Sequence, residues 1–162
     1  MKSSLFRGAK MMPRGEEMEI EVTNRQRKVR VDGKRLVRLA ERALGRLGLE
    51  DGQLSVVIVS DRRMAELNRT YRRVDGPTDV LAFAQQEGGG GGGNVHLLGD
   101  VVISAETAAR QAPRYRRSTE GEMDLLLVHG ILHLAGFDHI GSAEERKKMD
   151  AWKRKILRGW EG

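Results

Sequence analysis

Three of the four histidines lie close together near the C-terminal end of the chain, at His129, His133 and His139. Four residues of helix turn about 400°, so the imidazoles of His129 and His133 would lie on one face, one turn apart. Gly136 permits a bend after this helix, which would bring His139 back towards the pair. The spacing therefore predicts a metal site with His129, His133 and His139 as ligands. Zinc is the preferred ion, although imidazole also binds Ni, Co, Cu and Fe.

Three neutral imidazoles leave one tetrahedral position for water, which is the arrangement of catalytic rather than structural zinc. The alternative is that these are core or capping histidines, but three at this spacing favour metal binding. Asp138 has two open interpretations. It could accept a hydrogen bond from the far nitrogen of a ligand, or it could cap the turn.

Gly130 follows the first histidine of the spacing H-x-x-x-H-x-x-G-x-x-H. A class of zinc proteases has the same spacing and carries glutamate at this position as general base. Glycine cannot take a proton, so peptide hydrolysis by that route is disfavoured unless a carboxylate from elsewhere replaces it. A Lewis-acidic metal with cations nearby is instead suited to a phosphodiester.

The composition describes a single globular domain of 162 residues, with 39% hydrophobic and 32% charged residues. No apolar run approaches the roughly 20 residues needed to span a bilayer. The formal charge of +6 favours nucleic acid as partner, although an arginine-rich source genome would also explain it. The absence of cysteine leaves His, Asp and Glu as metal ligands and fits a reducing cytoplasm.

Hydrophobic periodicity predicts an α+β fold, with a single mixed sheet of four to five strands packed with helices. Strands are expected at 18–23, 28–32 (as a hairpin partner of the first), 54–60, 79–85 and 95–104. Helices are expected at 34–49, from Ser60 or Asp61 to about 72, and from Ser104 to about Pro113.

Two further helices are expected in the C-terminal part of the chain. Thr119 and Glu122 form a possible capping box for an almost wholly apolar helix, which should be the zincin-like metal-binding helix of the core. Ser142 and Glu145 form a second capping box before the last helix. Residues 1–17 are expected to be a disordered basic arm, and 18–162 the single catalytic domain. The Gly-rich loop 87–94 lacks the lysine of a phosphate loop.

Two more segments, 67–83 ("LNRTYRRVDGPTDVLAF") and 97–104 ("LLGDVVIS"), precede 129–139 ("HGILHLAGFDH"). In this order the sequence resembles the YbeY family of bacterial ribosomal RNA maturation factors. The resemblance implies a zinc-dependent, single-strand-specific endoribonuclease. It would act in 16S rRNA 3′-end maturation and in ribosome quality control, in the cytoplasm. It implies ribosomal RNA and the small ribosomal subunit or its precursors as partners, with ribosomal proteins and an assembly GTPase besides.

The resemblance also assigns roles to residues. It implies one Zn²⁺ on His129, His133 and His139 with a water, and Arg72, His129 and His133 as catalytic residues. Arg72, which alone would be interpreted as a solvated helix arginine, would also bind substrate together with Thr78 and Asp79. The chain departs from the family pattern at Ala82 and Ala84, in the glycine run and in the basic arm.

Two other functions stay open at this point. The first is a metal-dependent peptidase or other hydrolase. The second is a ribosome assembly factor whose metal is structural, because no general base is evident. Within the nuclease hypothesis, either a water or the adjacent 2′-hydroxyl would be the nucleophile.

Overall fold

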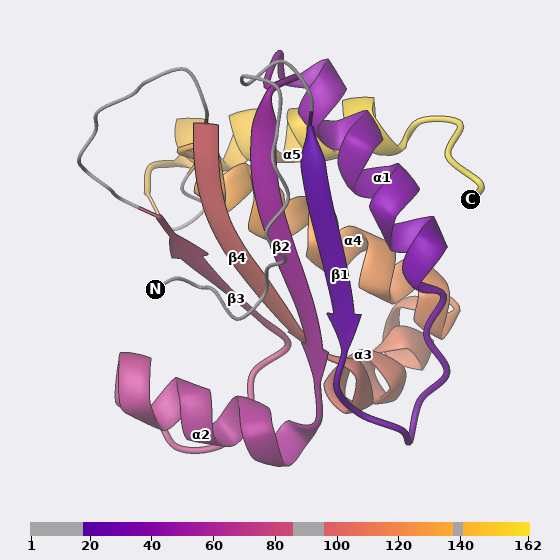
Figure 1. The fold of residues 1–162 in the computed structure, drawn as a ribbon, viewed down its shortest axis with the longest axis vertical. Helices are drawn as coiled ribbons and strands as arrows, with labels where there is room; N and C mark the ends of the chain where they lie inside the picture. Colours follow the sequence, from indigo (N-terminus) through magenta and orange to yellow (C-terminus); the bar gives the residue numbers. More distant parts are fainter. Residues whose placement is uncertain (1–17, 86–95, 138–140) are drawn as a thin grey trace.

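The computed structural model describes residues 18–85, 96–137 and 141–162. It contains β1 (Glu19–Asn24), α1 (Gly33–Arg46), β2 (Gly52–Val59), α2 (Asp61–Arg72), β3 (Val80–Ala84), β4 (His96–Ser104), α3 (Ala105–Gln111), the 3₁₀ helix η2 (Ala112–Tyr115), α4 (Thr119–Leu134) and α5 (Ala143–Leu157) (Figure 1). The expected arm at 1–17, the loop at 87–94, Asp138 and His139 lie outside the described residues. In the part that is described, no helix is long and apolar enough to cross a membrane.

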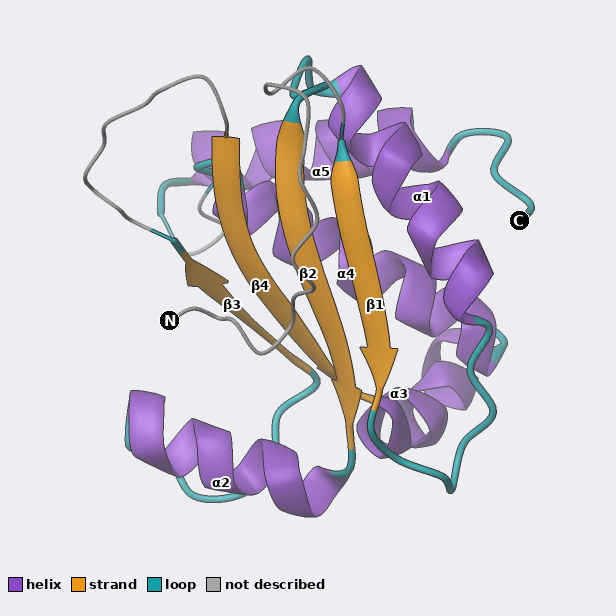
Figure 2. Cartoon of the chain, viewed as in Figure 1, coloured by secondary structure: helices purple, strands orange, loops and turns teal. Residues whose placement is uncertain are grey.

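The four strands form one mixed sheet in the order β1-β2-β4-β3, which confirms the expected α+β class. β1, β2 and β4 are parallel, and β3 runs antiparallel to β4. Because side chains alternate along a strand, Val56 and Ile58 enter the core formed with α1, α4 and α5. Val57 and Val59 face the other way and pack with Met64 of α2. Figure 2 shows α2 apart from the helices that cover the opposite face.

The expected hairpin of 18–23 with 28–32 is wrong, because β1 pairs in parallel with β2 instead. The side chain of Gln26 explains why no second strand forms. Its Oε1 accepts from Val29 N at 3.0 Å and its Nε2 donates to Val29 O at 2.8 Å, so the backbone groups of Val29 are used in a loop. Val29 and Val31 still pack against the core, which accounts for their strand-like pattern.

α4 is the buried central helix that its apolar sequence predicts. Met123, Leu127, Val128 and Ile131 are among its buried side chains. The expected capping box of Thr119 and Glu122 is wrong. Ser118 is the N-cap, and its Oγ accepts from Gly121 N at 2.9 Å. The predicted caps Ser60, Ser104 and Ser142 are confirmed, and Gly136 has the positive φ of +103° that the bend requires.

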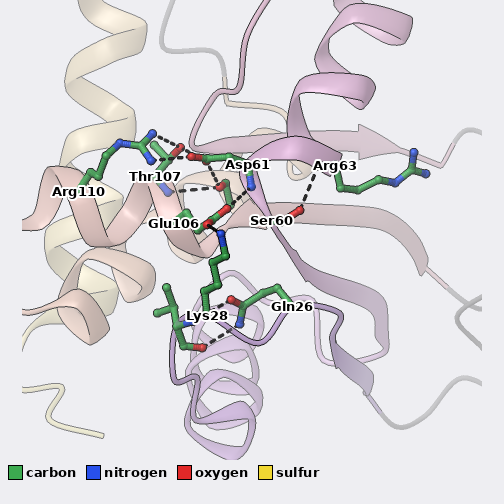
Figure 3. Close-up of polar contacts among 10 residues, drawn as sticks. Gln26, Lys28, Ser60, Asp61, Arg63, Glu106, Thr107 and Arg110 are labelled. Carbon is green, nitrogen blue, oxygen red and sulfur yellow. Dashed lines mark hydrogen bonds and ion pairs between the residues drawn. The ribbon is translucent and has the colours of Figure 1, made fainter.

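A group of polar side chains around Asp61, here called the Asp61 cluster, joins the starts of α2 and α3 (Figure 3). Oδ1 of Asp61 accepts from Ser104 Oγ at 2.7 Å and from Thr107 Oγ1 at 2.6 Å, and Oδ2 pairs with Arg110. Asp61 N donates to Glu106 Oε1 at 2.7 Å, and Glu106 also pairs with Lys28 at 3.4 Å. The cluster ties α2 to the edge where β4 ends and α3 begins.

Candidate active site

One face of α4 lines a cavity of about 280 Å³. Leu125 and Leu126 lie three and four residues after Glu122, and His129 lies four and three residues after them, so all four share this face. The other lining residues come from β3 and its preceding loop, from α3, η2 and the segment after it, and from α5: Asp79, Val80, Gln111, Tyr115, Arg117 and Lys153. The cavity thus gathers residues that lie far apart in the sequence around one predicted ligand, His129.

The imidazoles of His129 and His133 lie next to each other on α4, as the four-residue spacing predicts. Their ring centroids are 5.1 Å apart and the ring planes meet at 60°. Both residues are half-buried. Two imidazoles in this relation suit a shared metal ion, because each ring can turn a nitrogen towards the space between them. The third expected ligand, His139, falls outside the described residues, so the described chain holds a pair of candidate ligands rather than three.

Gly130 is buried against β4, on the side of α4 that faces the sheet. A Cβ placed on Gly130 would lie 2.6 Å from Cγ1 of Val101 and 3.0 Å from its Cγ2. Such distances leave no room for any side chain unless the helix and the sheet move apart. The protease glutamate is therefore excluded by packing, and a carboxylate at this position would point into the core rather than towards the cavity.

Two carboxylates reach the cavity from positions other than 130, namely Glu122 in the first turn of α4 and Asp79 in the loop before β3. Together with Gln111 and Arg117 they are here called the Glu122 cluster. Glu122 is only 2% exposed. Its Oε1 accepts from Arg117 NH1 at 2.8 Å and its Oε2 from Gln111 Nε2 at 2.6 Å. The same Gln111 nitrogen donates to Oδ2 of Asp79 at 3.0 Å. One amide thus holds two carboxylates at the wall of the cavity, and Arg117 offsets their charge.

Positive charge enters the cavity from two sides. Arg117 lies between Tyr115 and Glu122, with its guanidinium carbon 5.0 Å from the centre of the tyrosine ring. Lys153 comes from α5. Burial lowers the pKa of Lys153; nearby Asp150 opposes this and the charge of Arg117 adds to it, and the pKa is lowered overall. Both cations therefore lie at the wall of the same cavity.

Residues 21–161 match the family model described as Endoribonuclease YbeY. The chain belongs to the endoribonuclease YbeY family. It is 45% identical over 141 residues to Endoribonuclease YbeY of Geobacter metallireducens, covering 86% of this chain and 94% of that one. It is 46% identical over 133 residues to Endoribonuclease YbeY of Aquifex aeolicus, covering 82% and 85%. The solution structure of TM1509 from Thermotoga maritima is similar, with a TM-score of 0.58 and 26% identity over 87% of this chain and 91% of that one.

The site residues expected from the YbeY resemblance fall into two places. Asp79 lines the cavity together with His129, and the half-buried Thr78 directly precedes it. Arg72 is exposed at the last position of α2, and it is not among the described residues that line this cavity. α2 packs on the face of the sheet opposite α4. The structure thus brings Asp79 and His129 together at one cavity, and Arg72 is not among its described lining residues.

Of the cavity residues that the sequence analysis missed, Glu122 carries a weak signal in the sequence. Glu122 is seven residues before His129, so a charged residue and a histidine share one face of an otherwise apolar helix. That spacing could have indicated a common site. Gln111, Tyr115, Arg117 and Lys153 offer no such pattern, because tertiary folding alone brings them to α4.

Proposed function

We propose that this protein is a zinc-dependent endoribonuclease that cleaves single-stranded RNA in 16S rRNA 3′-end maturation and in ribosome quality control. Two findings support the proposal: membership of the endoribonuclease YbeY family, and a cavity in which His129 lies with two cations. Proposed partners are the small ribosomal subunit or its precursors, ribosomal proteins and an assembly GTPase. The observation that carries the proposal is that His129 of the histidine pair lines the same cavity as Arg117 and Lys153. The pair suits a metal, and the cations suit a phosphodiester.

The metal would be held by His129, His133 and His139. The described pair fits zinc because both donors are imidazoles on one face of a helix, one turn apart. When bound, zinc supplies Lewis acidity and lowers the pKa of a coordinated water. The absence of cysteine leaves imidazole and carboxylate as the usual zinc ligands that this chain offers.

Asp79 is the carboxylate proposed to take the proton that a protease glutamate would take. Its Oδ2 is fixed by Gln111, and in the described part of the chain its Oδ1 accepts no hydrogen bond. A carboxylate held on one oxygen can present the other to a nucleophilic water or 2′-hydroxyl. Arg117 and Lys153 would offset the charge that develops on the phosphate.

The test pairs metal analysis of the purified protein with RNA cleavage. Wild type is expected to contain about one zinc per chain and to cleave single-stranded RNA, and cleavage should be lost with a chelator and return with zinc. His133→Ala should lose both metal and cleavage while keeping its fold. Asp79→Asn should keep the metal and lower the cleavage rate about 10²-fold or more.

Two results would contradict the proposal. The first is histidine-dependent cleavage of casein without cleavage of RNA. The second is a folded His133→Ala variant that binds pre-ribosomes and supports normal RNA processing. Analysis of the cleaved ends also identifies the nucleophile, since a 2′,3′-cyclic phosphate would rule out direct attack by water. Arg72→Ala shows whether the arginine across the sheet contributes to cleavage.

A further inference from the structure

We propose that Tyr115, Arg117 and Lys153 form a subsite that binds one nucleotide of single-stranded RNA beside His129. Lys153 and Arg117 would contact the phosphate, and the tyrosine ring would stack on the base. The inference rests on the proposed function, because it assigns the residues that hold the same substrate. All three residues line the cavity that His129 also lines.

Lys153 is held in a way that is unusual for a surface charge. The side chain of Lys153 is only 22% exposed, and in the described part of the chain its ion-pair partner is Asp150, at a distance of 4.0 Å. A typical surface lysine of this protein, Lys28, is 79% exposed. Half-burying a lysine opposite an arginine costs free energy unless an anion sits between them. The lowered pKa of Lys153 agrees with this interpretation.

Arg117 already has a partner in Glu122, but that pairing uses one end of its guanidinium. The side chain is 37% exposed, and the planar group carries five N–H donors. Donors that do not contact Glu122 can bind a phosphate, for which the guanidinium geometry is well suited. Glu122 therefore orients Arg117 towards the cavity rather than cancelling it.

Tyr115 provides an aromatic surface at the rim. It is 58% exposed, which is high for a large hydrophobic side chain. Pro113 at the start of η2 and the left-handed Arg116 after it set the direction of this short segment. With Arg117 against one part of the ring, the rest is open to a base, and stacking on an aromatic ring is the general way in which proteins bind unpaired bases.

The size of the cavity limits what it can hold. Its volume of about 280 Å³ is just below the ~300–1,000 Å³ of small-molecule pockets. A single nucleotide is the expected occupant, and a base-paired helix would not enter. The subsite would therefore favour unpaired RNA by steric exclusion.

The test measures binding of the full-length, zinc-containing protein to a fluorescein-labelled, 2′-O-methylated decauridylate by fluorescence anisotropy, over a series of NaCl concentrations. Lys153→Gln is expected to weaken binding about fivefold to tenfold and to reduce the slope of log Kd against log salt by about 0.7, the value for one phosphate contact. Tyr115→Leu should weaken binding about tenfold, and Tyr115→Phe should stay within about twofold of wild type. Arg117→Gln should resemble Lys153→Gln.

The matched controls are Lys148→Gln, an exposed lysine of the same helix, and Arg46→Gln, an exposed arginine at the end of α1. Both should change affinity less than about twofold. Since Arg117→Gln removes a partner of buried Glu122, Lys153→Gln and Tyr115→Leu decide the outcome, with thermal unfolding to verify their fold. The inference is overturned if both bind like wild type, or if Lys148→Gln loses as much affinity as Lys153→Gln.

Binding and cleavage are separate measurements, so the two proposals can fail independently. If wild type binds through these residues but cleaves no RNA in the zinc-containing form, the subsite stands and the proposed function fails. If wild type cleaves RNA while Lys153→Gln and Tyr115→Leu bind like wild type, the proposed function stands and the subsite fails.

Discussion

The Asp61 cluster and the Glu122 cluster use similar side chains for different ends. Each places a carboxylate beside an arginine and neutral hydrogen-bond donors, and each joins α3 to another helix. Around Asp61 the donors are Ser104, Thr107 and Arg110, which lie within seven residues of one another and bind both carboxylate oxygens (Figure 3). Around Glu122 the arginine is Arg117, which pairs with the carboxylate and also lines the cavity that His129 lines. The first cluster uses its charges to join elements, whereas the second also exposes Arg117 to the cavity in which the proposed substrate would bind.

The Glu122 cluster and the cavity keep their places only if α4 lies close against β4. Substitutions of Gly130, which contacts Val101 of β4, are therefore expected to have the largest effect on stability. Gly130→Ala should lower the free energy of unfolding by about 1–2 kcal/mol, because overpacking against Val101 exceeds the helix-propensity gain of alanine. Gly130→Glu should cost more, since it also buries a carboxylate. Urea unfolding measures both.

Gly45→Ala is the control for this substitution. Gly45 is also helical, but the nearest atom to an added Cβ is Met18 Cε at 3.9 Å. We expect it to be neutral or stabilising by up to about 1 kcal/mol. Equal stabilities of the Gly45→Ala and Gly130→Ala variants would show that α4 has room to move away from the sheet.

Glu122→Gln and Asp61→Asn test the comparison directly. Both should lower the free energy of unfolding by about 1–2 kcal/mol, less than Gly130→Glu, since each weakens hydrogen bonds to an arginine and to neutral donors. Only Glu122→Gln should also reduce RNA cleavage, by about tenfold, because Arg117 loses the partner that orients it. Similar losses of cleavage in two folded variants would contradict the division of roles.

The pH dependence of stability sharpens the description of the Asp61 cluster. Burial raises the pKa of Asp61, but hydrogen bonds from Thr107, Ser104 and Arg110, with the charge of Arg110, bring it below the ordinary value of 3.8. A carboxyl whose pKa is depressed by folding contributes stability that is present above 3.8 and is lost as the pH falls through the folded pKa.

The stability difference between wild type and Asp61→Asn should therefore be constant from about pH 5 to 7 and shrink as the pH falls further. Urea unfolding at a series of pH values measures it. A difference that persists unchanged to about pH 2 would show that the acidic form of Asp61 keeps the same contacts.

The smallest expected effect is at the rim of the Asp61 cluster. Lys28 pairs with Glu106 at 3.4 Å while its own side chain is 79% exposed. Lys28→Gln should change the free energy of unfolding by less than about 0.5 kcal/mol, and salt should reduce even that. A loss above about 1 kcal/mol would mean that Lys28 belongs to the structural part of the cluster.

Local signals predicted much of this fold. The caps Ser60, Ser104 and Ser142 act through residues three positions away, so short motifs reveal them. The buried stripe of α1 and the apolar run of β2 follow from periodicity in the same way. The spacing of His129 and His133 is a local signal of the same kind, because residues four apart on a helix lie on one face.

The features that sequence reasoning missed depend on distant partners. Val29 and Val31 alternate like a strand, yet Gln26 holds this segment in a loop and β1 pairs with the distant β2. Glu122 fits a capping box locally, but Gln111 and Arg117 bind it instead. The contact of Gly130 with Val101 is equally invisible, because 29 positions of chain separate the two residues.

The close approach of Gly130 to Val101 also has an evolutionary meaning. A lineage with this packing cannot acquire the peptidase glutamate by one tolerated substitution, because the first step destabilises the domain before any new activity exists. Making space first, by shrinking the valine, would leave a void in the core and lower stability as well. The histidine motifs proposed for phosphodiester hydrolysis and known for peptide hydrolysis differ at this residue, and a sequence on the way from one to the other would be less stable than either.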